Sequence, residues 1–199
     1  MDLNVKYTKL NLGCGKDAAS KLPLPFLNVD AAGDAADMQM DIRELPQSWT
    51  NRFEEARASH VLEHFFMNEM PKVIAEWVRA LKPNGLLRII VPDLAVVLYE
   101  LVNKRDSKGR PSISIEATTR ALAQIYGIGY DTAETNNYLR HRFIFDEDAL
   151  VNLLRKNLDL HQICKYQKED DPAKFYGIND DSQNHFSLCV SARKRGGTY

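Results

Sequence analysis

The strongest constraint on the fold is a glycine-containing turn that directly follows a short apolar strand near the amino terminus. Residues 9–12 are typical of that strand, and Gly13, Cys14 and Gly15 follow it. Glycine has no Cβ, so two glycines here let the backbone come close to a ligand. The next strand ends at Asp30, whose carboxylate can accept hydrogen bonds from a ribose diol. The pattern predicts that this chain binds a nucleoside-containing cofactor.

Further strand-like runs alternate with amphipathic helices along the chain. The predicted strands are residues 9–12, 26–29, 38–40, 55–61, 86–91, 158–166 and 185–193. Apolar residues spaced by three and four predict one helix from about Met70 to Leu81 and another after Asp146, a plausible N-cap. Asp93 is expected to cap a third helix. Strands mixed with such helices indicate an α/β fold with a layered sheet and crossover helices.

The length of 199 residues predicts one domain over residues 1–199. Within it, residues 103–143 change character: a polar loop is followed by a short helical pattern and a stretch rich in Tyr, Asn, Arg and His. Segments of this size between regular elements are often lids or substrate sites. We therefore expect an inserted lid or acceptor segment there.

Composition excludes several functional classes. The net charge is −1 and no basic stripe is present, which argues against nucleic acid as a partner. The amino terminus lacks the apolar core of a signal peptide, and charged residues interrupt the most apolar stretch, so no membrane span is expected. Three widely separated cysteines suggest neither a disulfide framework nor a zinc site. A cytoplasmic protein with no metal site is the expectation.

Two cofactor classes share the glycine loop and the acid. Gly13-x-Gly15-x-x-Ala18 satisfies the dinucleotide fingerprint loosely. That fingerprint requires a helix after the loop to bind pyrophosphate, but residues 16–25 contain Pro23 and Pro25 and leave room for about one turn. S-adenosylmethionine has no phosphate. The glycines can approach its methionine part, Asp30 can hold its ribose, and Asp41 can accept from its adenine amino group.

The chain resembles the class I methyltransferases that use S-adenosylmethionine, most closely their small, single-domain, type 11-like branch. The resemblance rests on five motifs in order, namely LNLGCG, NVD, DMQMDI, ASHVLEHF and LKPNGLLRIIVPD. It is close over about residues 7–100 and looser over 144–195. It implies a Rossmann-like three-layer fold with a seven-stranded, mostly parallel sheet in the order 3-2-1-4-5-7-6, whose last strand is antiparallel.

The resemblance also implies roles for individual residues. The residues expected to contact S-adenosylmethionine are Asn11, Gly13, Cys14, Gly15, Asp30, Asp41, Ile42, Ser59 and His60. Two departures from the family affect the expected affinity. Asn11 stands where the family commonly has an acid, so a hydrogen bond remains but the charge is lost. The helix after the glycine loop is almost absent, which leaves that edge of the pocket more open.

Methyl transfer is an in-line displacement on a carbon that the sulfonium already activates, so proximity and alignment supply most of the catalysis. A weakly acidic acceptor would also need a general base, and histidine is the natural candidate. We predict His141 and His64 as catalytic candidates. Tyr138, Arg140 and Arg142, which surround His141 in the lid-like segment, are predicted to bind the acceptor.

The resemblance implies that the acceptor is a small molecule or a sugar. Two alternatives remain. The chain could be a catalytically degenerate methyltransferase fold that serves as a partner or scaffold, as Asn11 and the lost helix suggest. It could also be an NAD(P)-dependent oxidoreductase, as the loose fingerprint suggests. The oligomeric state is not predicted.

Overall fold

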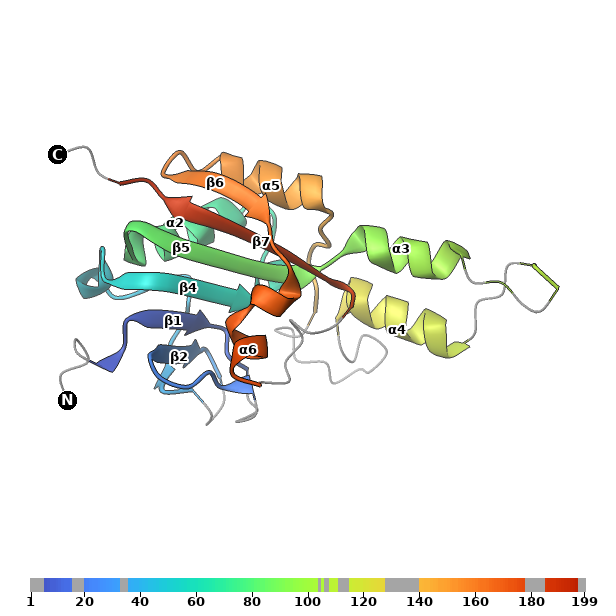
Figure 1. Cartoon of the computed structure of the whole chain (residues 1–199), viewed down its shortest axis with the longest axis horizontal. Helices are drawn as coiled ribbons and strands as arrows, with labels where there is room; N and C mark the ends of the chain where they lie inside the picture. The colour runs from blue at the N-terminus through green and yellow to red at the C-terminus, as the bar shows by residue number, and fades with distance from the viewer. Residues whose placement is uncertain are drawn as a thin grey trace.

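Seven strands form a single sheet in the computed structural model, which describes residues 6–15, 20–32, 36–103, 105, 108–110, 115–127, 140–177 and 185–196. The strand order is β3-β2-β1-β4-β5-β7-β6 (Figure 1). The strands are β1 (Lys9–Leu12), β2 (Phe26–Asp30), β3 (Met38–Gln39), β4 (Phe53–Ser59), β5 (Leu81–Pro92), β6 (Leu160–Lys165) and β7 (Ser187–Lys194). Neighbours pair in parallel except around β7, which is antiparallel to both β5 and β6. The predicted fold and strand order are confirmed.

The predicted helices also form, with bounds close to those expected. They are α2 (Met70–Ala80), α3 (Leu94–Asn103), α4 (Ile115–Tyr126) and α5 (Glu147–Arg155). Asp146 caps α5 by accepting from the amide of Ala149 at 2.7 Å, and Asp93 accepts from the amide of Ala95 at 2.9 Å. These side chains satisfy amide groups that a helix start leaves without partners. None of the described helices combines the length and the apolar character needed to cross a bilayer.

One face of the sheet is apolar and lies under α2 and α5. The inward side chains alternate along each strand, as Leu10 and Leu12 do on β1, and are fully buried. From α2, Trp77 packs into this core and donates its indole N–H to the carbonyl of Ile42 at 3.0 Å. Burying a Leu or Val side chain stabilises the fold by about 1.5–3 kcal/mol, so this layer is the main source of stability.

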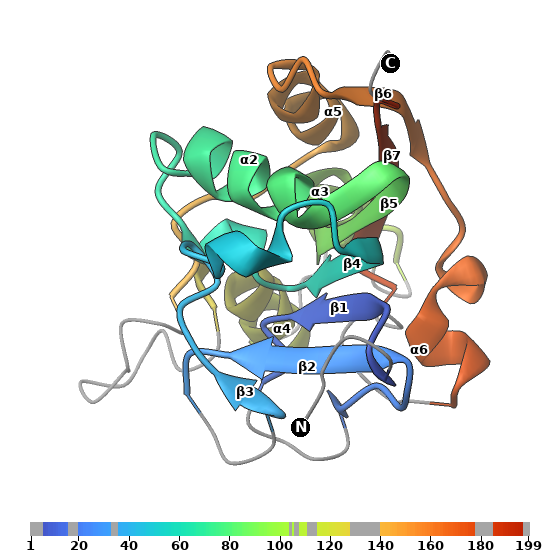
Figure 2. The same ribbon diagram turned by 90° about the vertical axis from the view of Figure 1, so that its left-hand side faces the viewer.

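The opposite face of the sheet carries polar side chains, and the short helix α6 (Pro172–Phe175) lies on it (Figure 2). Arg57 on β4 is 1% exposed and forms an ion pair with Asp171, which is 0% exposed, at 2.9 Å. Asp171 also accepts from the Tyr166 hydroxyl at 2.9 Å and caps α6 through the amide of Ala173. This contact attaches the segment after β6 to the middle of the sheet.

The polar layer continues from Arg57 across the first two strands. Arg57 donates to the side-chain oxygen of Asn11 at 3.4 Å, and Asn11 donates to Asn28 at 2.9 Å. Asn28 in turn contacts the backbone of Leu22 and the carboxylate of Asp37. Buried amides of this kind are stable when their donors and acceptors are paired. Parallel sheets usually bury apolar side chains on both faces, so this layer is unusual.

Two features of the fold differ from the sequence-based prediction. The strand predicted at 86–91 begins earlier, at Leu81, because Pro83, Asn84 and Gly85 continue it with Asn84 at φ 64° instead of separating it from α2. Helix α6 was not predicted, because four residues carry too little periodicity to indicate a helix.

Within the predicted lid or acceptor segment, α4 packs beside α3 beyond the carboxyl ends of the parallel strands (Figure 1). Their contact is a small apolar cluster of Val97, Ala121 and Phe186. Residues 104, 106–107, 111–114 and 128–139 of the segment lie outside the described residues, and Tyr138 is among them. The division into one domain with an inserted segment stays a prediction.

Asp171→Asn should destabilise the protein by about 3–5 kcal/mol, because it leaves the Arg57 charge buried without a counter-ion. Urea unfolding followed by circular dichroism measures this change. The exposed pair of Lys82 and Glu54 provides a control: Glu54→Ala should change stability by less than about 1 kcal/mol. Equal effects of the two substitutions would contradict the importance of the buried pair.

Candidate functional site

The glycine loop lies at the carboxyl end of β1, between the two neighbours β2 and β4. The backbone amides of Gly13 and Cys14 donate hydrogen bonds to the carbonyl of Val29, at 2.8 and 3.2 Å, and hold the loop in place. Gly13 and Gly15 both adopt positive φ angles, 68° and 78°, which favour glycine. The strand order reverses direction at β1, and ligands of open α/β sheets bind at such a point.

The two glycines differ in their surroundings. A Cβ at Gly13 would overlap the side chain of Val61, so the loop packs directly against the segment that follows β4. A Cβ at Gly15 would meet no atom of a described residue within 4 Å, whereas residues 16–19 lie outside the described part. Gly13 therefore serves the close packing of two loops, while Gly15 borders open space of the kind a cofactor needs.

Asp30 connects the second strand to this loop. One carboxylate oxygen accepts from the amide of Gly15 at 2.8 Å, and the other accepts from the amide of Ala32 at 2.9 Å. Each carboxylate oxygen has two lone pairs, so each can still accept a hydrogen bond from a hydroxyl group. Asp30 thus positions the loop and retains the acceptors that a ribose diol requires.

Cys14 lies in the same loop with its side chain buried. Burial, together with the charges of Asp30 and Asp37, raises the pKa of its thiol to about 12. The thiol therefore stays protonated at neutral pH and is a poor nucleophile. Cys14 therefore packs within the glycine loop, and a role in covalent chemistry is not expected of it.

Other predicted cofactor residues are already engaged within the protein. Asn11 is 1% exposed, and its amide belongs to the polar layer beneath the sheet. Asp41 forms an exposed ion pair with Arg43 at 2.6 Å, and the hydrogen bonds from Arg43 hold the pKa of Asp41 below its usual range. Ile42 is buried and anchors α2 through its carbonyl. Cofactor contacts from these three residues stay predictions.

Ser59 and His60 end β4 beside the glycine loop. The Ser59 hydroxyl is buried and has no hydrogen-bond partner among the described residues. His60 adopts a positive φ of 52°, and its Nε2 lies 3.0 Å from the hydroxyl of Ser187. Its other ring nitrogen, Nδ1, lies 3.3 Å from the carboxylate of Glu63. A strained backbone and an unsatisfied hydroxyl at one strand end are features typical of functional sites.

Glu63 is the centre of a histidine cluster next to that strand end. It lies in a single 3₁₀ turn, Leu62–His64, and its side chain is 0% exposed. Nε2 of His141 lies 4.0 Å from Oε1 of Glu63, and the rings of His64 and His141 are 4.9 Å apart. Burial acts to raise the pKa of Glu63, but His60 and the other two histidines outweigh it, so this pKa lies below its ordinary value.

Backbone contacts hold His141 next to Glu63. The amides of Arg142 and Phe143 donate to the carbonyl of Glu63 at 2.7 and 3.2 Å. Nδ1 of His141 lies 2.8 Å from the carbonyl of Gln124 at the end of α4. Burial, more than any neighbouring charge, lowers the pKa of His141, so its imidazole is neutral near physiological pH. The predicted catalytic histidines, His64 and His141, are thus brought together.

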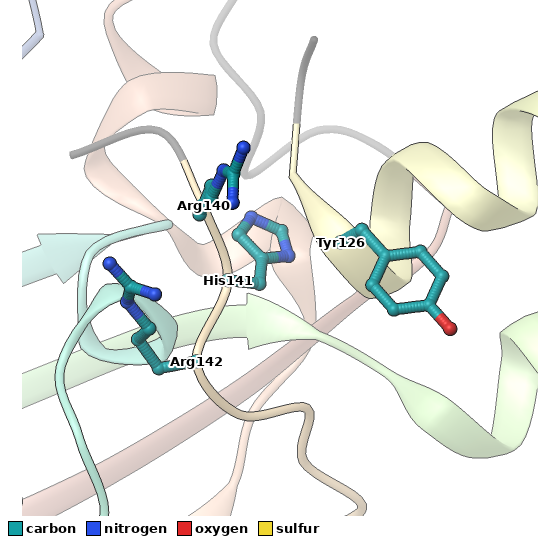
Figure 3. A pocket seen from close by; sticks show the side chains of 4 residues that line it. All are labelled: Tyr126, Arg140, His141 and Arg142. Atoms are coloured by element: carbon teal, nitrogen blue, oxygen red, sulfur yellow. The ribbon is translucent and has the colours of Figure 1, made fainter. Parts of the chain in front are cut away.

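A cavity of about 400 Å³ opens beside this cluster. Tyr126, Arg140, His141 and Arg142 line it (Figure 3). The guanidinium of Arg142 lies over the ring of Phe66 at 4.9 Å, and Tyr126 directs its hydroxyl away from His141. The predicted acceptor residues Arg140 and Arg142 therefore lie at a cavity, whereas Tyr138 lies outside the described residues.

Two residues of this site were not among the predicted site residues. Glu63 gave a weak signal because an acid at a helix start is usually favoured by the helix dipole. Its position within His60-Val61-Leu62-Glu63-His64 is the stronger signal, because it places two histidines and an acid within five residues. Tyr126 ends an amphipathic helix, where core packing was equally plausible.

Replacing each loop glycine by alanine should separate their roles. Both substitutions impose strain of about 1–3 kcal/mol from the positive φ. Gly13→Ala should also force Val61 to move, adding about 1–3 kcal/mol of overpacking, whereas Gly15→Ala should not. Thermal unfolding of the two variants measures the difference. A Gly15→Ala protein as destabilised as Gly13→Ala would contradict the described packing.

Comparison with known proteins identifies the same fold. Residues 10–89 match the family model for a methyltransferase domain (Methyltransf_11). No curated protein matches the chain. Among solved structures, the CurJ carbon methyltransferase aligns with a TM-score of 0.54 at 12% identity, over 94% of this chain and 48% of that chain. This chain thus spans about half of the length of CurJ.

Two further solved structures match more of their own length. The 1,6-didemethyltoxoflavin-N1-methyltransferase of Burkholderia thailandensis, with bound 1,6-didemethyltoxoflavin and S-adenosylhomocysteine, has a TM-score of 0.52 at 17% identity and covers 94% of this chain and 70% of that chain. An S-adenosylmethionine-dependent methyltransferase from Mesorhizobium loti has a TM-score of 0.52 at 16% identity, with coverage of 98% and 93%.

The strand order with its antiparallel last strand, the glycine loop joined to Asp30 and the methyltransferase-domain match over residues 10–89 agree with one another. This chain thus has the fold of S-adenosylmethionine-dependent methyltransferases, and its residues 10–89 match the family model for a methyltransferase domain.

Proposed function

We propose that this chain binds S-adenosylmethionine at the glycine loop and transfers its methyl group to a small-molecule or sugar acceptor by in-line displacement. The observation that carries the proposal is the bond from the Gly15 amide to the Asp30 carboxylate, which joins the loop and the ribose acceptor at the carboxyl edge of β1. When bound, the cofactor supplies a methyl group activated by its sulfonium. The remaining contributions come from residues of the chain.

The residues at the strand ends fit such a cofactor. Gly15 borders open space, Asp30 keeps acceptor lone pairs, and the buried Ser59 hydroxyl has no partner in the described part of the chain. An unsatisfied buried hydroxyl costs about 1–3 kcal/mol, which a ligand contact would offset. Residues 20–25 contain no α-helix, although 16–19 lie outside the described residues. This favours a cofactor without pyrophosphate over NAD(P).

The cavity beside His141 is the proposed acceptor site. Val61 packs against Gly13, and Glu63 accepts from Arg142, so two residues of the same loop join the glycine loop to the cavity wall. Arg140 and Arg142 add positive charge, which favours an acceptor that carries a carboxylate or another anionic group. Holding such a molecule in line with the methyl group is the main catalytic contribution expected of these residues.

His64 and His141 are proposed to act at the inner end of this cavity. Nδ1 of each ring faces a backbone carbonyl, Arg140 at 3.1 Å and Gln124 at 2.8 Å. A carbonyl can only accept, so Nδ1 of each ring carries a proton, and Nε2 keeps a lone pair whenever the ring is neutral. That nitrogen can take a proton from an acceptor hydroxyl or amine, or bind a cation.

Binding of S-adenosylhomocysteine, measured by titration calorimetry, tests the cofactor part. The wild-type chain should bind it, and Asp30→Ala should weaken binding about 10- to 100-fold, because charge-assisted bonds contribute about 1.5–3 kcal/mol each. Asp146→Ala, which removes only the cap of α5, should leave affinity unchanged. Absence of binding at millimolar ligand, or equal affinity in both variants, would contradict the proposal.

Transfer of a labelled methyl group from S-adenosylmethionine into a whole-cell extract, afterwards separated into small molecules, nucleic acid and protein, tests the activity. We expect label in the small-molecule fraction, and His141→Ala should reduce it at least about 10-fold while leaving S-adenosylhomocysteine affinity within about twofold. Label recovered in nucleic acid would refute the acceptor class. Cofactor binding without transfer to any fraction would instead support the degenerate, scaffold-like alternative.

A further inference from the structure

Three ligand groups of the kind that bind transition metals meet next to β4. They are the carboxylate of Glu63 and the imidazoles of His64 and His141, and one candidate ligand atom on each lies within 4.8 Å of the other two. Glu63 and His64 are neighbours in the turn after β4, whereas His141 arrives from the distant segment after α4. The meeting therefore depends on the tertiary fold.

The Glu63 carboxylate is a buried charge without a well-directed hydrogen bond. Both of its oxygens are buried without a hydrogen bond from any described residue, and the side chain is 0% exposed. The ion-pair contact with His60 at 3.3 Å is too poorly directed to satisfy them. A charge removed from water without hydrogen bonds is strongly unfavourable unless it is paired or binds a metal.

Backbone contacts orient the two histidines. Nδ1 of each ring faces a backbone carbonyl, so Nε2 is the ring nitrogen that remains to bind a metal ion. Metal-bound histidines commonly donate their other ring N–H to a carbonyl or carboxylate, which fixes the tautomer and the ring orientation. Here one candidate ligand atom from each imidazole and from the carboxylate lies within 4.8 Å of the others, so a single cation could contact all three.

We propose that Glu63, His64 and His141 form a binding site for a divalent transition-metal ion such as Zn²⁺. Two imidazoles and one carboxylate suit zinc and its neighbours better than Mg²⁺ or Ca²⁺, which prefer oxygen ligands. Bonds of about 2.0–2.2 Å place ligand atoms about 3.3 Å apart, so these atoms, which lie up to 4.8 Å apart, must approach one another by at most about 1.5 Å. His64 is half-buried and can move by rotation of its side chain.

Three protein ligands leave at least one coordination position for another molecule, which is the arrangement of catalytic rather than structural zinc sites. His141 belongs both to the cluster and to the wall of the 400 Å³ cavity, so the metal site would lie beside the proposed acceptor site. The ion would there bind an oxygen of the acceptor and fix its orientation. This role rests on the proposed function, whereas metal binding itself does not.

Titration of the chelator-treated full chain with Zn²⁺ tests the site. We expect one ion per chain with a dissociation constant at or below the micromolar range. Glu63→Gln, His64→Ala and His141→Ala should each weaken binding at least about 100-fold. His161→Ala is the matched control, because Nε2 of His161 is also buried without a described partner, but His161 belongs to no group of three candidate ligands among the described residues. It should bind zinc as the wild type does.

Cobalt(II) substitution identifies the ligands by a second readout. Nitrogen and oxygen ligands should give visible bands without the near-ultraviolet thiolate-to-cobalt band, and Cys164→Ser should leave the spectrum unchanged. Circular dichroism shows whether each variant is folded. S-adenosylhomocysteine binding, measured on the same variants, separates a failure of the metal site from a failure of the proposed cofactor site. No zinc binding at 100 μM (about a hundredfold above a micromolar dissociation constant), binding that survives all three ligand substitutions, or a thiolate band would overturn the metal site.

Discussion

The buried ion pair between Arg57 and Asp171 is the interaction on which the polar layer across the sheet depends. The two residues are 114 positions apart in the chain and almost fully buried. Arg57 also donates a hydrogen bond to Asn11, and Asn11 donates one to Asn28. The strands β4, β1 and β2 are thus linked by one polar layer. These are the strands whose carboxyl ends carry the glycine loop, Asp30 and the Glu63 turn.

This layer gives Asn11 a physical role. A carboxylate at that position would face the Arg57–Asp171 pair and add a second negative charge to a buried site, whereas an amide accepts from Arg57 and donates to Asn28. The departure from the family pattern is thus matched by its surroundings. Asn11 is therefore a weaker argument for a degenerate, inactive methyltransferase fold than the sequence alone suggested.

Local patterns predicted most of the fold, because the strands are short apolar runs and α2 and α5 repeat their apolar residues at helical spacing. The glycine loop and Asp30 were predictable for the same reason, since each immediately follows a strand. The polar layer could not be predicted: Arg57 looks like an ordinary strand residue until Asp171 is placed beside it. The contact between His141 and Glu63 could not be predicted either, because it depends on two backbone hydrogen bonds between segments that are distant in the sequence.

The site therefore combines a cofactor edge that the sequence indicates with a buried acid–histidine cluster that only the fold brings together. A crystal structure of the chain with S-adenosylhomocysteine tests this account most directly. We predict the ribose hydroxyls on the Asp30 carboxylate, the amino-acid part along Gly13–Gly15, and the sulfur directed toward the cavity that His141 lines. A ligand bound elsewhere, or one whose sulfur faces away from that cavity, would contradict it.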